Sequence, residues 1–427
     1  MDAFAALMTE EFHKSLRTAT ESRPRVGLNR NENPGGMAEE AAEKVVEDAK
    51  NLPQALKRRH IFSDLAARLK SGPPQNQRES EFFRNFRVAP SHTLTGISQS
   101  RAIRYDLVSM SIYLITGIAG FIGSSLARAV LEQGDDVRGI DNFSTGKRSN
   151  IAELLDRIDV READLLDLEA MQSACQGVDY VLHEAAIPSV PRSVLDPLES
   201  NRANIDGTVN LLVTARDAKV KRVIYAASSA AYGDTPTLPK HEDMIPNPIS
   251  PYAVAKLASE YYMTSFFRCY GLETVALRYF NIFGPRQDPT SPYSGVLAKF
   301  ITQMLKGEQP TIHGDGGQSR DFTYVDNVVH ANLLACKAPA SEVAGRVFNV
   351  ATGTRIDLNE MFRVLKKLTG YPGEVKHGPD RAGDVKHSLA DLSRGEKHLG
   401  YKPQVNFEEG LRRTVDWYRT QEKSARA

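Results

Sequence analysis

The sequence predicts an α/β protein with a doubly wound parallel sheet, a smaller C-terminal α/β domain and a poorly structured N-terminal extension. From Met110 to about residue 280, short apolar segments alternate with helical patterns. Repeated strand–helix–strand units of this kind build parallel sheets with right-handed crossovers. Beyond residue 281 the sequence becomes irregular and rich in glycine and proline. We expect this of a smaller domain that closes over a ligand.

The predicted elements follow one another in a regular order. Strands are expected at residues 111–116, 136–140, 158–163, 178–183, 223–227 and 274–277. Their largely apolar composition is typical of strands that are buried on both faces of a parallel sheet. Helices are expected between them, at residues 124–133, 207–218 and 252–270.

Residues 1–109 differ from the rest of the chain. Glu, Arg, Asn, Gln and Pro are scattered through them, and their apolar runs are short. A segment that buries little apolar surface does not offset the entropy cost of folding, so we expect this extension to be disordered or non-native. Because Met110 directly precedes the first predicted strand, we expect translation to begin there. A chain that starts at Met110 and fails to fold would contradict this expectation.

Charge and cysteine content restrict the classes of partner. Lys and Arg total 54 against 53 for Asp and Glu, which gives no electrostatic reason to expect nucleic acid or an anionic membrane as a partner. Cys175, Cys269 and Cys336 lie far apart, so we expect neither a disulfide framework nor a metal site. We find no apolar run long enough for a membrane span and no signal peptide. We therefore expect a cytoplasmic protein.

The first predicted strand leads into a turn with three regularly spaced glycines, Gly117, Gly120 and Gly123. Glycines at this spacing let backbone N–H groups and a helix N-terminus approach a pyrophosphate. Asp141 follows the second strand, where its carboxylate can accept both ribose hydroxyls of NAD and would repel the 2′-phosphate of NADP. A packing turn without a ligand is the alternative. The strand–turn–helix context favours a Rossmann site for NAD.

Tyr252 and Lys256 are separated by three residues at the start of a predicted helix, which places them one turn apart on the same face. A phenol with an ordinary pKa of about 10 is a poor base at neutral pH. A nearby ammonium and a cationic nicotinamide would both favour the phenolate. Tyr252 could then remove a hydroxyl proton while hydride leaves the same carbon. An amphipathic helix with an exposed lysine is the alternative, which the preceding dinucleotide motif disfavours.

Ser228 and Ser229 end the fifth predicted strand. Because parallel sheets bind ligands at the carboxyl ends of their strands, we expect these hydroxyls to face the same crevice as Tyr252. One of them, with Ser228 favoured, can hydrogen-bond the reacting oxygen and pass its proton to the phenolate. A turn-capping serine pair is the alternative. We interpret His183, at another strand end, as a hydrogen-bonded structural histidine rather than a metal ligand or base.

With these motifs in order, the chain from Met110 to about Tyr418 resembles the nucleotide-sugar epimerases and dehydratases of the extended short-chain dehydrogenase family. The resemblance covers roughly three quarters of the sequence. It rests on residues 116–123, 228–233, 252–256, 277–285 and 314–322. It implies a Rossmann domain at residues 110–280 that binds NAD and holds the catalytic residues, and a domain at residues 281–427 that mainly binds the nucleotide sugar.

The resemblance also assigns further site residues. Additional cofactor contacts are implied for Phe121, Ile122, Asn142, Asp164, Leu165, Ala185 and Ala186. Asn281, Arg320 and Arg381 are implied to bind the sugar diphosphate, and arginine forks suit phosphate oxygens. For either arginine alone, a surface salt bridge is the alternative. Asp384 is similar to a residue that holds the nucleotide ribose, and Ser189 to a substrate contact.

The reaction can be narrowed within the family. A 4,6-dehydratase would carry a threonine–aspartate–glutamate run after the fifth strand, because elimination of water needs an acid and a base. Ser229 and Ala230 stand at those carboxylate positions, which disfavours dehydration, and decarboxylation would also require a glutamate there. Oxidation at C4, rotation of the 4-keto sugar and return of hydride to its opposite face remain. The sequence therefore predicts an NAD-dependent 4-epimerase of UDP-hexoses.

The expected range of substrates depends on the small side chain of Ser388. Residues 185–193 and 384–391 are most similar to UDP-N-acetylglucosamine 4-epimerases. Ser388 stands where strict UDP-glucose epimerases carry a tyrosine, which leaves room for a 2-acetamido group without excluding smaller sugars. We expect UDP-N-acetylglucosamine and UDP-glucose to be accepted, and a homodimer is implied by the resemblance. A UDP-glucuronate 4-epimerase, another nucleotide-sugar oxidoreductase and a non-catalytic dinucleotide-binding protein are the alternatives.

Overall fold

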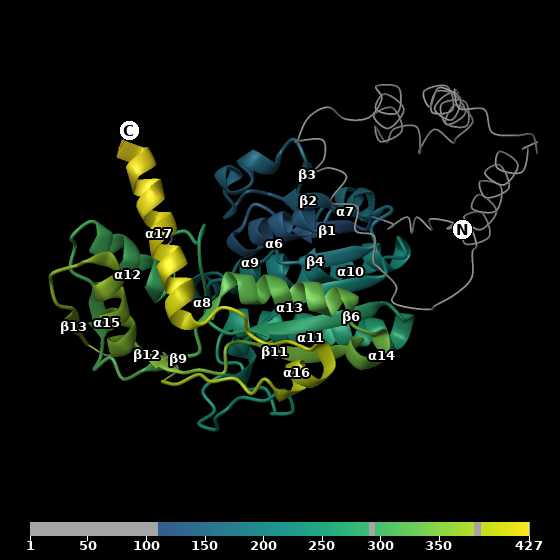
Figure 1. Cartoon of the computed structure of the whole chain (residues 1–427). Coiled ribbons are helices and arrows are strands. Elements are labelled where there is room, and N and C mark those ends of the chain that lie inside the picture. Colours follow the sequence, from purple (N-terminus) through teal and green to yellow (C-terminus); the bar gives the residue numbers. More distant parts are fainter. Residues whose placement is uncertain (1–109, 290–294, 380–385, 427) are drawn as a thin grey trace, which may run out of the picture. The chain divides into compact units, whose positions relative to one another are not determined.

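The computed structural model describes residues 110–289, 295–379 and 386–426 (Figure 1). The predicted N-terminal extension, residues 1–109, lies outside the described residues, and so do the predicted substrate contacts Arg381 and Asp384. Within the described part, no helix is both long and apolar enough to cross a membrane.

A seven-stranded parallel sheet forms the centre of the larger body, in the order β11-β6-β5-β4-β1-β2-β3. Its strands are β1 (Ile112–Thr116), β2 (Asp136–Asp141), β3 (Asp159–Glu162), β4 (Tyr180–His183), β5 (Arg222–Ser228), β6 (Glu273–Tyr279) and β11 (Arg346–Val350). The chain runs outward from β1 through β2 and β3, and on the other side through β4 and β5. The loops after β1 and β4 therefore diverge, and open α/β sheets bind ligands at such a point. The predicted fold class is confirmed.

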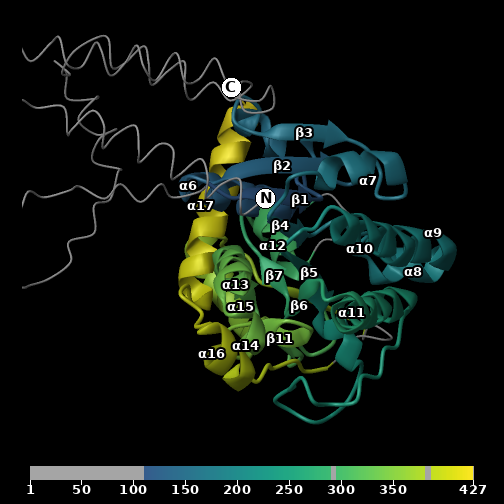
Figure 2. The same cartoon turned by 90° about the vertical axis from the view of Figure 1, so that its right-hand side faces the viewer.

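Helices cover both faces of the sheet, as Figure 2 shows. One face carries α6 (Phe121–Glu132) and α13 (Val325–Lys337), and the other carries α7 (Leu168–Cys175), α10 (Gly207–Asp217) and α11 (Pro251–Tyr270). Three short helices are α8 (Val190–Leu195) after β4, α14 (Ala340–Val343) after α13 and α16 (Ser393–Leu399) after β11. Because successive strand residues point to opposite faces, Leu114 and Ile115 are buried in two different cores. This explains why the strands are apolar throughout.

The predicted strands agree with the structure to within two residues at each end, but three elements differ. α6 begins at Phe121 instead of residue 124, because the extended backbone of Gly120 already caps it. The helix predicted at residues 207–218 is the end of a longer helical stretch, which runs from α9 (Pro197–Asn201) through a π-helical turn into α10. The Asp196 side chain starts that stretch by accepting the Glu199 N–H at 2.9 Å. β11 is not among the predicted strands.

Residues after β6 also build a smaller body with its own core. Its helices are α12 (Val296–Leu305), α15 (Leu358–Thr369) and α17 (Phe407–Arg426). Short strand pairs accompany them: β7 (Ile282–Phe283) with β10 (Thr323–Tyr324), β8 (Thr311–His313) with β13 (Lys376–Gly378), and β9 (Ser319–Arg320) with β12 (Ile356–Asp357). The Phe283 ring packs in this core, with its centroid 5.7 Å from that of Tyr324 and 5.8 Å from that of Phe407.

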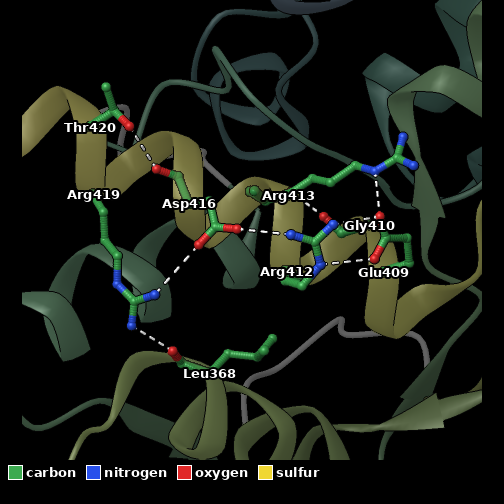
Figure 3. A network of polar contacts seen from close by, with 9 residues as sticks. Leu368, Glu409, Gly410, Arg412, Arg413, Asp416, Arg419 and Thr420 are labelled. Carbon is green, nitrogen blue, oxygen red and sulfur yellow. Dashed lines mark hydrogen bonds and ion pairs between the residues drawn. The ribbon is translucent and has the colours of Figure 1, made fainter.

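The surface of α17 carries a network of ion pairs (Figure 3). Arg412 and Arg413 each bind Glu409 at 2.7 Å, and Asp416 links Arg412 to Arg419. These side chains are three or four residues apart and largely exposed, so each pair contributes little to stability.

One ion pair, in contrast, is buried inside the larger body. Arg278 of β6 donates to Glu260 of α11 through Nε at 2.9 Å and through Nη2 at 2.6 Å. Each of the two side chains is only 3% exposed. Because two parallel hydrogen bonds fix the direction of the carboxylate, the pair holds α11 in one orientation against the sheet.

We expect Glu260→Gln to lower the free energy of unfolding by about 3–5 kcal/mol, because the charge of Arg278 would stay buried without its partner. Denaturant unfolding followed by circular dichroism measures the loss. The control is Glu409→Gln, which disrupts only the exposed pairs of α17 and should cost much less. Similar losses in the two variants would show that the buried pair does not secure α11.

Candidate active site

One cleft follows the carboxyl ends of the strands from the glycine turn to the smaller body. Every predicted site residue that the structure describes lines this cleft. On the cofactor side these are Gly117, Gly120, Phe121, Ile122, Gly123, Asp141, Asn142, Asp164, Leu165, Ala185 and Ala186. The others are Ser189, Ser228, Ser229, Tyr252, Lys256, Asn281, Arg320 and Ser388. The fold thus brings together residues that are far apart in the sequence.

The glycine turn leaves no room for side chains. Gly117 has a φ of +68°, and a Cβ atom there would lie 2.8 Å from the Ala185 nitrogen. A Cβ atom on Gly123 would lie 2.2 Å from the Gly117 carbonyl oxygen. No side chain caps the first turn of α6, so its N–H groups can bind an anion. This cradle fits the pyrophosphate of a dinucleotide.

Asp141, at the end of β2, is held in one orientation by the backbone. Its Oδ2 atom accepts the Ala119 N–H at 2.9 Å, and its Oδ1 atom accepts the Phe143 N–H at 2.8 Å. Burial raises the pKa of the carboxyl, while these two N–H groups lower it. Each oxygen keeps a second lone pair, so Asp141 can also accept ribose hydroxyls. Next to it, Asn142 donates to the Asp164 carboxylate at 2.6 Å.

His183 is a structural residue, as the sequence indicates. Its Nδ1 atom lies 2.8 Å from the Thr116 hydroxyl, and its Nε2 atom lies 2.9 Å from the Thr208 hydroxyl. Burial, with a smaller effect of the Lys256 charge, lowers the pKa of the imidazole to about 3. His183 is therefore neutral near pH 7 and has both ring nitrogens satisfied.

Tyr252 lies in the first turn of α11, and local capping fixes its position. The Ser250 hydroxyl accepts the Ala253 N–H at 3.2 Å, and the Ser193 hydroxyl accepts the Tyr252 N–H at 3.0 Å. Burial raises the pKa of the phenol to about 12, and a hydrogen bond with Ser228 lowers it. Ser229 begins the 3₁₀ turn that follows β5. Of the two serines, Ser228 is the one whose hydrogen bond lowers the pKa of the phenol.

Burial is the largest influence on the pKa of the Tyr252 phenol in this structure. The expectation that Lys256 and a bound nicotinamide favour the phenolate stays a prediction. Lys256 is 4% exposed, and its Nζ atom donates to the Ala226 carbonyl at 2.7 Å. Burial lowers the pKa of Lys256 to about 8, against the opposing charge of Glu184. Spacing along a helix does not reveal how strongly each side chain is desolvated.

Three of the predicted substrate residues, Asn281, Arg320 and Ser388, line the same cleft. The Asn281 Nδ2 atom donates to the Ser388 hydroxyl at 3.1 Å and to the Asp321 carbonyl at 3.3 Å. Arg320 Nη1 donates to the carbonyls of Ser319 and Lys386, at 3.0 and 3.1 Å. Asn281 and Ser388 therefore form one polar wall.

The sequence interpretation overlooked two carboxylates at this site. Buried Asp321 accepts N–H groups of Thr352, Gly353 and Ala390 at 2.9 to 3.3 Å. It thereby fixes the chain next to Ser388. Glu184 lines the cleft and accepts a hydrogen bond from Tyr279. In the sequence, each of them is a single acidic residue: Asp321 lies inside the 314–322 motif, and Glu184 lies in the His-Glu-Ala-Ala stretch.

Known proteins are similar to this chain in sequence and in fold. The sequence model of the NAD dependent epimerase/dehydratase family matches residues 113–351. UDP-glucose 4-epimerase from Mycolicibacterium smegmatis is 38% identical over 310 residues, which are 72% of this chain and 98% of that protein. The structure of UDP-N-acetylglucosamine 4-epimerase from Methanobrevibacter ruminantium M1, in complex with UDP-N-acetylmuramic acid, is 41% identical with a TM-score of 0.70, covering 73% of this chain and 99% of that chain.

A third similar protein was solved with its cofactor. It is a mutant UDP-glucuronic acid 4-epimerase from Bacillus cereus, in complex with UDP-4-deoxy-4-fluoro-glucuronic acid and NAD. It is 32% identical with a TM-score of 0.68, covering 73% of this chain and 99% of that chain. The chain described here belongs to the NAD-dependent epimerase/dehydratase family. NAD is the cofactor of this family, and the glycine turn and Asp141 fit it.

Proposed function

We propose that the chain is an NAD-dependent 4-epimerase of UDP-hexoses. The observation that carries this proposal is the meeting of Tyr252, Ser228 and Lys256 in the cleft that begins at the glycine turn. Ser229 and Ala230 line the same cleft, where a dehydratase would need acidic side chains. The site therefore supports oxidation and reduction at one carbon without elimination.

The proposed chemistry divides between cofactor and protein. Bound NAD supplies an acceptor for the hydride from the sugar C4 and later a donor for its return. Tyr252 removes the proton of the C4 hydroxyl through Ser228, so that the C–H and O–H bonds are replaced by a carbonyl. The same proton returns from Tyr252 when the opposite face of the 4-keto sugar is reduced. Positive charge near the phenol lowers its pKa and favours the phenolate, which is the form that accepts the proton.

We propose that residues 110–280 hold the cofactor and the catalytic residues, and that residues 281–427 mainly hold the nucleotide sugar. Asn281, Arg320 and Arg381 are proposed to bind the diphosphate, since arginine forks match phosphate oxygens. Asp384 is proposed to hold the ribose and Ser189 to contact the sugar. Arg381 and Asp384 lie outside the described residues, and Asn281 and Arg320 line the cleft.

A homodimer is proposed from one surface of the larger body. The packed helices α8, α9 and α11 expose large apolar side chains, namely those of Val194, Leu195, Leu198, Val254 and Tyr261. Exposed apolar clusters mark interaction sites, and a second copy that presents the same surface would cover this one. Light scattering that gives the mass of a single chain would exclude the dimer.

We also propose a cytoplasmic location. The three cysteines of the chain are free thiols, and Cys175 and Cys336 are buried. Unpaired cysteines are typical of a reducing compartment. Recovery of the protein only from a secreted fraction would contradict this proposal.

The main experiment incubates the purified protein with UDP-glucose, UDP-N-acetylglucosamine and UDP-glucuronate in turn, and NMR detects the C4 epimer. We expect turnover of the first two sugars. Tyr252→Phe should lower kcat by roughly 10²- to 10⁴-fold, because the proton acceptor is lost. Tyr270→Phe, at the exposed end of the same helix, is the control and should retain activity.

Other outcomes of this experiment select the alternatives. Turnover of UDP-glucuronate alone would identify a UDP-glucuronate 4-epimerase. Bound NAD without turnover of any of the three sugars would indicate a non-catalytic dinucleotide-binding protein. Full activity of Tyr252→Phe would refute the proposed mechanism.

We expect Ser388→Tyr to abolish turnover of UDP-N-acetylglucosamine while UDP-glucose is still converted. A tyrosine would fill the space beside Asn281 that the small serine leaves open. The NMR assay with both sugars measures the ratio of the two kcat/KM values. Ser388→Ala removes the hydroxyl without adding bulk and should keep both activities within about tenfold. Unchanged conversion of the acetylated sugar by Ser388→Tyr would refute steric gating.

A further inference from the structure

An ion pair joins the two walls of the cleft close to the glycine turn. The Nζ atom of Lys147 lies 2.9 Å from the Oδ1 atom of Asp288, and both residues line the cleft. Lys147 belongs to the loop after β2 in the larger body. Asp288 belongs to the segment after β7, which pairs with β10 in the smaller body. The pair therefore connects the two bodies across the cleft, and the proposed mechanism does not use it.

The lysine side of the pair is anchored on the glycine turn. The Lys147 N–H donates to the Ala119 carbonyl at 3.0 Å, and the Asn150 amide donates to the same carbonyl at 2.8 Å. A Cβ atom on Gly146 would lie 2.9 Å from the Ala119 side chain and 2.9 Å from the Asp141 carboxylate. The backbone of Lys147 is thus held next to the two parts of the cleft that fit the pyrophosphate and a ribose of NAD.

The segment that carries Asp288 is anchored on both bodies. Arg286 Nη2 donates at 2.9 Å to the hydroxyl of Ser125, which lies in the second turn of α6. The carbonyl of the next residue, Gln287, accepts a hydrogen bond from the Tyr418 hydroxyl of α17. Arg286 has a φ of +68°, a left-handed conformation that costs free energy in a residue with a side chain. The contacts on both sides hold the segment in this conformation.

The ion pair itself is only partly buried. The side chains of Lys147 and Asp288 are 48% and 30% exposed. A pair with this exposure contributes little to the stability of the fold, and salt screens it. It can open without disturbing the two anchored backbone segments, since only the side chains have to move. We therefore expect the pair to affect the movement of a molecule through the cleft more than the folding of the chain.

We propose that Lys147 and Asp288 form a clasp that retains NAD. A dinucleotide whose pyrophosphate occupies the glycine turn lies beside this ion pair, and it leaves the cleft on this side only after the pair has opened. Retention suits a cycle in which the hydride returns to the same sugar, because the cofactor need not exchange between turnovers. The inference goes beyond the proposed function and depends on the NAD site, not on which sugar reacts.

The alternative is that the two charges act on the cofactor directly. A pyrophosphate is anionic, so the ammonium of Lys147 would attract it and the carboxylate of Asp288 would repel it. Loss of the Asp288 charge would then slow the release of the cofactor. The clasp predicts faster release from the same variant. The two explanations therefore differ in the sign of one measured effect.

The test measures the release of the cofactor in the absence of sugar. Protein loaded with NADH is mixed with an excess of NAD, and the change in NADH fluorescence gives the dissociation rate. Asp288→Asn should release NADH roughly two- to fivefold faster than the parent protein, the size expected for a partly exposed ion pair. Added salt should accelerate release less in this variant than in the parent protein, because no pair remains to be screened.

Two further variants serve as controls. Glu162→Gln removes a carboxylate from the exposed pair of Arg148 with Glu162, which lies within the larger body, and should leave the rate unchanged. The double variant Lys147→Asp with Asp288→Lys exchanges the two charges and should bring the rate back toward that of the parent protein.

Unchanged or slower release from Asp288→Asn would overturn the inference. Release from the charge-exchanged variant that is as fast as from Asp288→Asn would also contradict it, because the restored pair would then have no effect. The Tm values of all variants should remain close to that of the parent protein, since the exposed pairs contribute little to stability. A parent protein without epimerase activity would refute the proposed function and leave this comparison of release rates valid.

Discussion

The architecture of the site depends on the close contact between the turn after β1 and the chain after β4. A Cβ atom at Gly117 would lie within 3 Å of the Ala185 backbone, so the two segments touch without an intervening side chain. This contact is possible because the strand order reverses between β1 and β4, where the two connections diverge to opposite faces. The same contact leaves the N-terminus of α6 open and fixes the backbone of Glu184 next to the glycine turn.

An ion pair and a hydrogen bond between side chain and backbone position the opposite wall of the cleft. α11 carries both Tyr252 and Lys256, and the buried pair of Glu260 with Arg278 ties this helix to β6. A serine hydroxyl from α8 holds the N–H of Tyr252. Backbone contact thus positions the glycine turn, and polar side chains position α11. The distance between the glycine turn and Tyr252 depends on both.

Much of this arrangement is readable from the sequence because its signals are local. A strand buried on both faces is a continuous apolar run, so six of the sheet strands can be placed to within two residues. The glycine spacing and the Tyr252–Lys256 pair are equally local. β11 escapes prediction because it is short and Asn349 interrupts its few apolar residues. Glu184 escapes because its partner Tyr279 is 95 residues away, and the high pKa of Tyr252 reflects burial by the folded chain as a whole.

The path of the chain has a further consequence. After β6 it enters the smaller body, returns with α13 and β11, and leaves again with α15. The chain therefore crosses between the two bodies several times. A large rotation of one body relative to the other would have to bend all of these segments at once. For the same reason, no single cut in the gene would yield two independently folding halves, since a cut after β6 would remove an edge strand from its own sheet.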